Sequence, residues 1–500
     1  MKFAAFFYQH GLKLLHPESL PIDQDPASLS FASIGKMPSF DHPPLDLDYT
    51  FSHSLQQALH DKLLLLSELP FPIQLLHEHY LHGYVGFMKS VVLQEGTYIC
   101  NRCGNHEQRL FAQILCARCG EECTYCRKCV TMGRASECTP LVYWRGSEWH
   151  APISSDQLLV WNGVLTPEQS QASEQVIEAV LGRKRLLVWA VCGSGKTEIL
   201  YRGIEEALKQ QMRVCIATPR TDVVLELEPR LKRVFPNVPI LSLYSGSPRT
   251  ELDSPFVIST THQLLRYRHA FDVVIIDEVD AFPYSYDNML AFAVNRAKKR
   301  HASTVFLTAT PNKQLKKEAA SGELPVVKIP VRYHRHPMPV PRFIWCGNWE
   351  KLLKKRKVPI VVLEWLQKRT SENKQCLLFV PTVDIAVQLE EILSVRFKVA
   401  SVYSEDPERK KKVEQFRRGE LNMLITTTIL ERGVTVPNID VAVFGAEHSV
   451  FTESALVQIA GRVGRSAEFP DGDVCFFHFG KTKAMLDSVR HIVEMNQYAR

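Results

Sequence analysis

The chain has 500 residues, a formal net charge of +6, 45% apolar residues and 23% charged residues. This composition is ordinary for a globular protein and excludes a disordered or fibrous chain, and the length is enough for about three domains of roughly 100–200 residues each. The apolar run at residues 3–7 is too short for a signal peptide, and no later run approaches the ~18 apolar residues that span a membrane. The sequence therefore predicts a cytosolic protein without a transmembrane segment. The modest basic charge permits an anionic partner without requiring one.

Residues 1–95 carry no recognisable chemical motif. They mix polar stretches and prolines with an apolar, helix-like segment near residues 55–68. The pair His77-Glu78 is followed by Leu81 where a zinc-protease motif needs a second histidine. We treat this part as an N-terminal region of unknown role.

Cysteines concentrate in the next segment, where eight of the thirteen lie between residues 100 and 138. In a reducing compartment such clustering favours metal ligation over disulfides. The doublets Cys100/Cys103 and Cys116/Cys119 share the form C-x-R-C-G, and twelve residues separate them. This spacing is typical of two knuckles that hold one structural Zn²⁺ in a zinc ribbon.

The other four cysteines of the segment permit several arrangements. A second zinc ion, an interleaved pairing between two ions, and simple buried thiols are all open for Cys123, Cys126, Cys129 and Cys138. Four thiolates leave no coordination position for water, so we expect structural rather than catalytic metal. We assign a zinc-binding cysteine module to residues 96–145.

A helix signal and then two series of strand patterns follow. Thr166 is a helix cap and Pro167 suits the first helical position. The first series of buried-strand patterns, which alternates with helical segments, is RLLVWAVCG, RVCIATP, PFVISTT, FDVVIIDE and TVFLTAT. After a proline-rich break, the second series is QCLLFVP, VASVYS, NMLITTT, DVAVFG and GDVCFFHF. Such alternation is typical of doubly wound parallel sheets, so we expect an α/β protein with one lobe at residues 160–332 and a second at 340–490.

The turn after the first strand of this series reads AVCGSGKT, residues 190–197. Glycines let backbone N–H groups approach phosphate oxygens closely, and a helix N-terminus carries partial positive charge. Ala190 stands where the usual phosphate-binding loop has its first glycine. The segment predicts a phosphate cradle made of Ala190, Gly193, Ser194, Gly195, Lys196 and Thr197.

Two acidic residues, Asp277 and Glu278, follow the strand pattern FDVVII. Carboxylates are costly within a buried strand and are expected at its carboxyl end, where α/β sheets bind ligands. Asp277, together with Thr197, can hold Mg²⁺, and Glu278 can orient the water that attacks a γ-phosphate.

A third element, ALVQIAGRVGRS, lies near the end of the chain. On a helix, Arg462 and Arg465 would share one face with Gln458 one turn earlier. The two glycines are unfavourable within a helix and indicate a close approach to another element. With a phosphate-binding loop in the same chain, these residues are interpreted as arginine fingers that reach the triphosphate from the second lobe.

These segments, in order, resemble the motifs of superfamily 2 helicases and translocases, which have two RecA-like lobes. The matching segments span residues 165–490 and are LTPEQ, GSGKTE, ATPRTDVVLEL, VISTTHQLL, DEVD, LTATP, LLFVPT, ITTTILERGVTVP and QIAGRVGRS. A cysteine module before the first lobe, combined with DEVD, is similar to the late competence family ComFA of naturally transformable Gram-positive bacteria. The related PriA helicases share the GSGKTE loop, but their zinc element lies inside the helicase core and their acidic motif ends in histidine, where this chain has Asp280.

The resemblance implies roles for single residues. Gln169 matches a glutamine that reads adenine, although it also fits a capping box with Thr166. Thr308 and Thr310 match a motif that couples hydrolysis to lobe movement. Thr435 stands where many relatives have aspartate, so we assign it no role.

Further segments match loops that face nucleic acid in this family. They are Thr218–Arg220, Thr260–Thr261 and Thr426–Thr428. Basic clusters at 351–357 and 408–419 are either solvated helix faces or strand contacts.

The resemblance implies an ATP-driven translocase on single-stranded DNA, with ATP, Mg²⁺ and Zn²⁺ as cofactors. It further implies work in the cytoplasm, at the inner face of the membrane, in the uptake of transforming DNA, with ComFC and DprA as partners. A replication-restart helicase or an RNA-remodelling helicase would share the same motor. A zinc-dependent binding module without nucleotide turnover is the alternative outside the enzymes.

Overall fold

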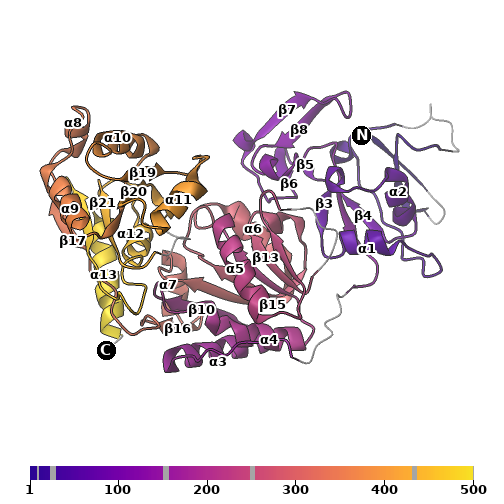
Figure 1. The fold of residues 1–500 in the computed structure, drawn as a ribbon. Coiled ribbons are helices and arrows are strands. Elements are labelled where there is room, and N and C mark those ends of the chain that lie inside the picture. Colours follow the sequence, from indigo (N-terminus) through magenta and orange to yellow (C-terminus); the bar gives the residue numbers. More distant parts are fainter. Residues whose placement is uncertain (8–10, 23–29, 150–156, 248–253, 431–435, 499–500) are drawn as a thin grey trace.

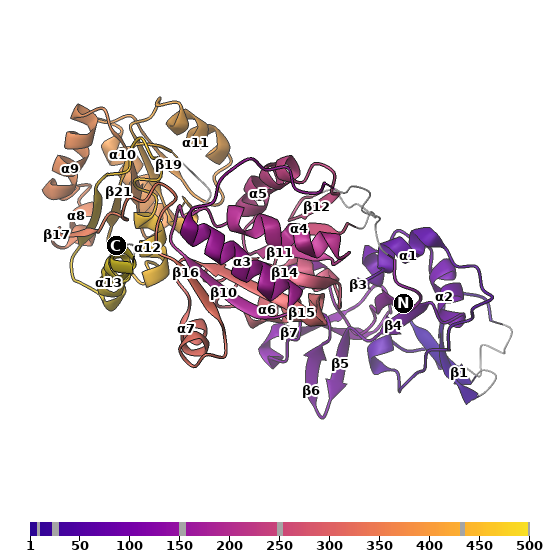
Figure 2. The ribbon, with the colours of Figure 1, turned by 90° about the horizontal axis from the view of Figure 1, so that it is seen from below.

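The computed structural model describes residues 1–7, 11–22, 30–149, 157–247, 254–430 and 436–498. Three parts lie in a row: the N-terminal and cysteine-rich region, a first parallel sheet in the middle, and a second parallel sheet at the far end (Figure 1). The same order is visible from below (Figure 2). The middle part contacts both of its neighbours, through Arg296 with Asn101 on one side and Cys192 with Gln458 on the other.

The N-terminal region contains two small antiparallel sheets and two short helices. A three-stranded sheet has the order β3-β9-β4, and a two-stranded sheet pairs β1 with β2. The segment near 55–68 is not one helix, because α1 ends at Leu59 and β3 follows. The elements are β1 (Phe3–Phe7), β2 (Lys13–Pro17), α1 (His53–Leu59), β3 (Leu63–Leu65), η4 (Leu66–Glu68), α2 (Ile73–Leu81), β4 (Val85–Met88) and β9 (Leu141–Trp144).

The cysteine-rich segment folds as two antiparallel hairpins between β4 and β9. The hairpins are β5 (Val91–Gln94) with β6 (Thr97–Cys100), and β7 (Phe111–Leu115) with β8 (Glu122–Cys126). Because β9 pairs with β3 and β4, both ends of this segment are held by the N-terminal sheet.

The first lobe is a seven-stranded sheet in which every pairing is parallel, in the order β12-β13-β11-β14-β15-β10-β16. All five strand patterns of the first series are strands, while β12 and β16 were not among them. Alternate residues of the strands belong to two separate cores, one on each face of the sheet, because helices cover both faces. The strands are β10 (Arg185–Ala190), β11 (Val214–Thr218), β12 (Ile240–Leu243), β13 (Phe256–Thr260), β14 (Phe271–Asp277), β15 (Lys298–Thr308) and β16 (Val326–Ile329).

The helical elements of this lobe begin with a well-capped helix, since the Thr166 side chain accepts a hydrogen bond from the Gln169 amide and Pro167 is the first helical residue. They are α3 (Pro167–Leu181), η7 (Glu198–Leu200), α4 (Tyr201–Lys209), α5 (Thr221–Val234), η8 (Gln263–Arg266), α6 (Asn288–Ala297) and α7 (Lys313–Ala320).

The second lobe is a six-stranded parallel sheet in the order β17-β22-β21-β18-β20-β19. The prediction of an α/β protein with two RecA-like parallel-sheet lobes is confirmed. The strands and α-helices of the second lobe are β17 (Arg342–Trp345), α8 (Trp349–Leu353), α9 (Ile360–Ser371), β18 (Gln375–Phe379), α10 (Val383–Leu393), β19 (Val399–Val402), α11 (Arg409–Arg417), β20 (Met423–Thr426), β21 (Ile439–Phe444), α12 (Glu453–Ala460), β22 (Val474–His478) and α13 (Lys483–Tyr498).

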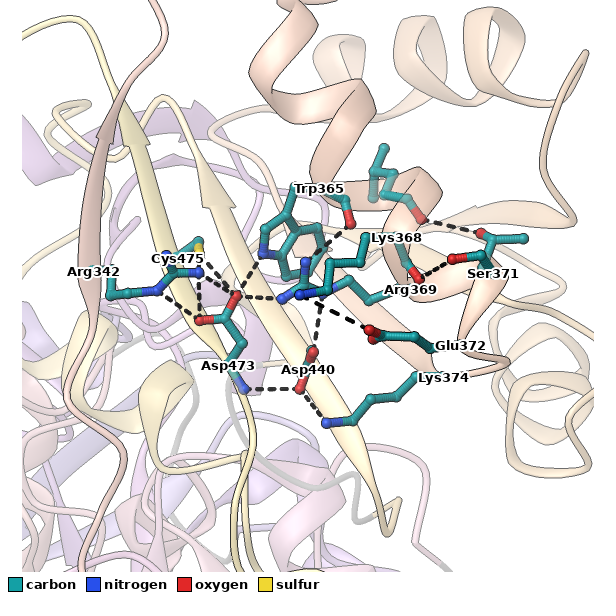
Figure 3. Close-up of polar contacts among 12 residues, drawn as sticks. Arg342, Trp365, Lys368, Arg369, Ser371, Glu372, Lys374, Asp440, Asp473 and Cys475 are labelled. Atoms are coloured by element: carbon teal, nitrogen blue, oxygen red, sulfur yellow. Dashed lines mark hydrogen bonds and ion pairs between the residues drawn. The ribbon is translucent and has the colours of Figure 1, made fainter.

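A cluster of charged side chains ties α9 to the amino ends of β21 and β22 (Figure 3). Arg369 donates to Asp440 at 3.0 Å and also to Asp473, while Arg342 donates to Asp473 at 2.7 Å. Burial acts to raise the pKa of Asp473, but hydrogen bonds from Arg342 and Trp365 outweigh it and hold the pKa at about 2. The cluster therefore favours the ionised form of Asp473 in the folded lobe.

Candidate functional site

The predicted phosphate cradle and the acidic pair emerge from the same edge of the first sheet. Residue Ala190 ends β10 and the rest of the cradle follows it, Asp277 ends β14, and β15 lies between these two strands. The parallel register pairs Trp189 with Thr308 and Asp277 with Leu307. Since the carboxyl ends of parallel strands meet at one edge, the cradle, Asp277 and Thr308 are brought to one side of the lobe. Lys196 and Thr197 are half-buried there, before η7 and α4.

The Gln169 side chain forms a hydrogen bond with the cradle and also completes the capping box of α3. Its Oε1 accepts from the Thr166 amide at 2.8 Å, and its Nε2 donates to the Ser194 carbonyl at 2.7 Å. Gly195 has a φ of +75°, and a Cβ at this position would lie 2.4 Å from the Gln169 Nε2 atom. Gly195 therefore needs both its left-handed backbone and its lack of a side chain.

The cradle also touches the second lobe. The Cys192 thiol donates to the Gln458 Oε1 atom at 2.9 Å, and a Cβ on Gly461 would lie 2.6 Å from the Cys192 Cβ. The close approach that the glycine pattern indicated is thus present at Gly461. Cys192 was not singled out from the sequence, because no local pattern indicates a contact 266 positions away.

Arg462 and Arg465 do not lie on a helix face, contrary to the sequence prediction. Helix α12 ends at Ala460, Arg462 lies in the turn that follows, and Arg465 lies just after this turn. The chain turns because Gly464 has a φ of +68°, and a Cβ there would lie 2.0 Å from the Pro470 carbonyl oxygen. Arg462 is buried, and this burial, followed by the positive charge of Arg465, lowers its pKa. The Arg465 Nε donates to the Gly461 carbonyl at 3.0 Å.

A buried arginine outside the predicted motifs links the cradle to this arginine turn. Arg332 follows β16 and donates to the carbonyls of Val463 at 2.8 Å and Gly464 at 2.6 Å. The next amide, that of Tyr333, donates to the Gly193 carbonyl at 3.0 Å. Sequence reasoning missed Arg332 because an arginine in a proline-rich connection has no distinguishing pattern.

The acidic motif continues into a hydroxyl network that crosses between the lobes. Thr308 and Thr310 each donate to one oxygen of the Asp280 carboxylate at 2.6 Å. Ser454 of α12 donates to the same carboxylate, and its Oγ lies 2.8 Å from the Oγ of Thr310. Glu278, at the start of this segment, has a φ of +58°, which is uncommon for a residue with a side chain.

A cavity of about 1210 Å³ opens between the lobes on the side of α5 and α11. Arg220 spans it by donating to the Ile429 carbonyl at 2.7 Å. One wall contains the exposed side chain of Phe282, just after the acidic motif. The lining residues are Pro219, Arg220, Thr221, Asp222, Leu225, Glu226, Phe282, Pro283, Ser404, Arg409, Lys410, Val413, Glu414, Arg417, Thr427, Thr428 and Ile429.

The predicted nucleic-acid-facing residues divide into two groups around this cavity. Pro219–Arg220 and Thr427–Thr428 line it, as do residues of the basic cluster at 408–419. The remaining threonines of these segments are buried and absent from the lining: Thr218, Thr260, Thr261 and Thr426. The basic cluster at 351–357 also does not line it. Thr435 lies outside the described residues.

The eight cysteines of the module form two buried groups, and the pairing is interleaved. The first cluster is Cys100, Cys103, Cys126 and Cys129, and the second cluster is Cys116, Cys119, Cys123 and Cys138. The preferred assignment of Cys100/Cys103 and Cys116/Cys119 to one ion is therefore wrong. Hairpin β7–β8 is the reason, because it pairs Phe111 with Cys126 at one end and Leu115 with Glu122 at the other. With a rise of roughly 3.3 Å per residue, the hairpin keeps Cys116 far from Cys126.

Both clusters fit a tetrahedral zinc ion. Within each cluster the sulfur atoms all lie within 4.8 Å of one another, and the cysteines are free thiols rather than disulfides. Measured pairs are Cys103–Cys126 at 3.6 Å, Cys100–Cys129 at 3.9 Å and Cys116–Cys138 at 3.7 Å. Four thiolates about 2.3 Å from Zn²⁺ have sulfur atoms about 3.8 Å apart, so little movement is needed to bind the ion.

Among the residues that the structure describes, no helix has the length and apolar character needed to cross a membrane.

Three family models match successive parts of the chain. Residues 48–143 match the competence protein ComFA N-terminal domain, residues 162–313 match the type III restriction enzyme res subunit, and residues 356–467 match the helicase conserved C-terminal domain. A solved structure of Dbp5 from S. cerevisiae bound to RNA and ADP BeF3 aligns with a TM-score of 0.48 at 16% identity, over 66% of this chain and 92% of that chain.

Two curated relatives cover most of the chain. Competence protein ComFA of Bacillus subtilis (strain 168) is 51% identical over 91% of this chain and 98% of its own length. Competence protein ComFA of Streptococcus pneumoniae (strain ATCC BAA-255 / R6) is 39% identical over 75% of this chain and 86% of its own length. The chain therefore belongs to the competence protein ComFA family, within the superfamily 2 helicases.

Proposed function

We propose that this chain is an ATP-dependent translocase on single-stranded DNA that drives the uptake of transforming DNA. The observation that carries the proposal is that the phosphate cradle and the cavity both lie between the two lobes. The cradle touches Gln458 of the second lobe, and residues of both lobes line the cavity. Opening and closing of the lobes would therefore change both sites together.

In this proposal, the nucleotide lies on the cradle with the second lobe against it. Lys196 contacts the β- and γ-phosphates, Thr197 and Asp277 hold Mg²⁺, and Glu278 orients the attacking water. The other cradle residues surround the phosphates with backbone N–H groups: Ala190, Gly193, Ser194 and Gly195. Gln169 reads the adenine base in addition to capping α3. ATP supplies the free energy, and these side chains bind, orient and protect the reacting groups.

The second lobe would complete the nucleotide site. Arg462 and Arg465 stabilise the charge that develops on the γ-phosphate, and Gln458 acts beside them. Arg332 would hold the arginine turn in place through its hydrogen bonds to the Val463 and Gly464 carbonyls. Lobe closure would then place the arginines, because their turn already packs against Cys192.

Single-stranded DNA is the ligand proposed for the cavity. The four cations of the lining, Arg220, Arg409, Lys410 and Arg417, outnumber its three carboxylates, Asp222, Glu226 and Glu414. Hydroxyl groups of Thr427 and Thr428 suit phosphate oxygens without reading sequence. The Phe282 side chain is 74% exposed at this cavity and offers a flat surface on which a base can stack. The combination suits a flexible single strand better than a rigid duplex.

The family membership supports the cellular part of the proposal. We propose that the protein works in the cytoplasm at the inner face of the membrane, where it pulls the incoming strand, and that ComFC and DprA are its partners. A PriA-like replication-restart helicase and an RNA-remodelling helicase are the competing assignments for the same motor.

The test is the rate of ATP hydrolysis by the purified full-length chain. We expect stimulation by single-stranded DNA, weaker stimulation by RNA of the same sequence, and no preference for forked over plain strands. Preference for forks would favour a replication-restart helicase, and preference for RNA would favour an RNA-remodelling enzyme. Absence of turnover under all conditions would reject a motor.

A further inference from the structure

The two cysteine clusters occupy different environments. The first cluster (Cys100, Cys103, Cys126, Cys129) belongs to the same hydrophobic core as Leu264, Leu265 and Leu290 of the first lobe. The second cluster (Cys116, Cys119, Cys123, Cys138) forms a separate group with Ile114 packed against it. A metal ion in the first cluster would thus stabilise a surface on which the first lobe rests, whereas an ion in the second would not.

Arg296 of α6 joins the first cluster to η8. Its Nη1 donates to the Asn101 carbonyl at 3.0 Å and to the Arg102 carbonyl, both within the turn between Cys100 and Cys103. Its Nη2 donates to the Leu265 carbonyl in η8. Burial lowers the pKa of Arg296 to about 10, so the guanidinium remains charged at neutral pH. One partly buried cation therefore binds carbonyl groups from both elements.

A second link runs through Glu68. The buried Arg102 side chain donates to both oxygens of the Glu68 carboxylate, at 3.0 and 2.9 Å. Arg266, the last residue of η8, donates to the same carboxylate at 2.8 Å. Glu68 thus connects the cysteine turn to η8 by charged hydrogen bonds, which are stronger than neutral ones. Close packing supports this contact, since a Cβ on Gly104 would lie 2.7 Å from the Phe292 ring of α6.

From η8 the connection continues to the cavity between the lobes. The Thr261 amide, just before η8, donates to the Thr218 carbonyl at 2.9 Å. Thr218 directly precedes Pro219 and Arg220, which line the cavity. The position of η8 therefore influences the wall that these two residues form.

We propose that the first cluster, with its metal ion, is a brace that fixes η8 and the cavity wall in the orientation that binds a single strand. Glu68 and Arg296 are the positioning residues of this brace, and the second cluster takes no part in it. The inference rests on the proposed function, because it assigns the cavity to single-stranded nucleic acid. Thiolate clusters of this kind fold only around their metal, so loss of the ion would release the Cys100–Cys103 turn and both links.

The first experiment compares the two clusters within the full-length chain. One variant carries Cys126→Ser and Cys129→Ser, and its matched control carries Cys116→Ser and Cys119→Ser. Zinc content, amide hydrogen exchange of residues 256–268, and affinity for a fluorescent oligothymidylate are measured for each. We expect each variant to lose one of two zinc ions. Only the first-cluster variant should show faster exchange and an affinity roughly ten- to a hundredfold lower, the range of typical couplings between sites.

The second experiment leaves all cysteines in place. Glu68→Gln removes the shared charge of the brace, and Glu137→Gln is the control, because Glu137 is a buried carboxylate that accepts from the Thr124 amide beside the second cluster at 2.7 Å. We expect Glu68→Gln to retain both zinc ions and the basal hydrolysis rate while exchange in η8 rises and affinity falls. Glu137→Gln should match the wild type in affinity and in η8 exchange.

The outcomes are distinct for the brace and for the proposed function. Absence of zinc from the wild type, equal effects of the two cluster variants, or unchanged exchange and affinity in Glu68→Gln would each overturn the brace. A wild type that neither binds oligothymidylate nor is stimulated by it would instead reject the proposed function. The exchange data, which need no DNA, would still decide whether the first cluster holds η8.

Discussion

Thr310 and Ser454 come from different lobes, yet their hydroxyl oxygens lie 2.8 Å apart and both donate to the carboxylate of Asp280. Thr310 follows the strand that lies between the cradle and Asp277, and Ser454 lies in the first turn of the helix that carries Gln458. The buried carboxylate of Asp280 therefore links the cradle edge of the first sheet to the second lobe. Movement of α12 relative to β15 has to break or remake these bonds.

Ser454→Ala should uncouple nucleotide turnover from strand binding, because it removes the contribution of the second lobe to the network. We expect the stimulation of hydrolysis by single-stranded DNA to fall about tenfold, with nucleotide affinity changed less than about twofold. Ser371→Ala is the control, since this hydroxyl donates to the Lys368 carbonyl within α9, away from the contact between the lobes. Equal stimulation in the Ser454 variant and the wild type would show that the network does not transmit the signal.

Lys196→Ala and Glu278→Gln should both abolish turnover, but for different reasons. The first removes the cation proposed to hold the phosphates, so ATP affinity should fall as well. The second keeps the shape of the side chain and removes only the group proposed to orient water, so ATP should still bind while hydrolysis falls about 10²–10⁴-fold. Binding of a fluorescent ATP analogue and release of phosphate, measured on the same preparations, separate the two cases. Substantial DNA-stimulated hydrolysis in either variant would contradict the assigned roles.

Arg465→Ala should lower the catalytic rate far more than the affinity for ATP. A finger contacts charge that develops in the transition state, and such contacts contribute about 10³–10⁵ in rate. Steady-state kinetics give both quantities. The control is Arg490→Ala on α13, where the arginine forms an exposed ion pair with Asp487. Proportional losses of rate and affinity would indicate damage to the arginine turn instead of a missing finger.

Phe282→Ala should weaken binding of single-stranded DNA by roughly 1–3 kcal/mol, the range for one base stacked on an aromatic ring. An oligonucleotide without bases should bind the wild type and the variant equally, because stacking requires a base. Phe479→Ala is the control, since Phe479 is half exposed and does not line the cavity. If the variant lost affinity equally for both oligonucleotides, the effect would come from the shape of the cavity.

The charged cluster around Asp473 should make the second lobe sensitive to acid. The folded pKa of about 2 lies below the value near 3.9 expected in the unfolded chain. Stabilisation by this group, about 2 kcal/mol, is therefore fully present above pH 5 and is lost as the pH falls from about 4 to 2. Urea unfolding at pH 5 and pH 3 should show that Asp473→Asn destabilises the protein more at pH 5.

The matched control for this pH dependence is Asp487→Asn. Its exposed ion pair with Arg490 should contribute about 0–1 kcal/mol, so its effect should hardly differ between the two pH values. If Asp473→Asn destabilised the protein equally at both values, the ionised carboxylate would not be the source of the stability.

The sequence alone determined the α/β class, the ten strands of the two predicted series and the order of the motifs, because hydrophobic periodicity and turn chemistry are local properties of the chain. It also placed Asp277 at a strand end and Gln169 in a capping box with Thr166. A short apolar run was ambiguous, and the segment near 55–68 divides into α1 and β3, since the length of an apolar run does not distinguish a helix from a strand.

The tertiary structure alone decided which distant residues meet. The length of hairpin β7–β8 sets the interleaved cysteine clusters, and α12 ends at Ala460, so Arg462 and Arg465 lie beyond the helix. The contacts of Cys192, Arg332, Glu68 and Arg296 join segments more than thirty positions apart. Such contacts depend on how whole elements pack against one another, and no local pattern in the sequence records that packing.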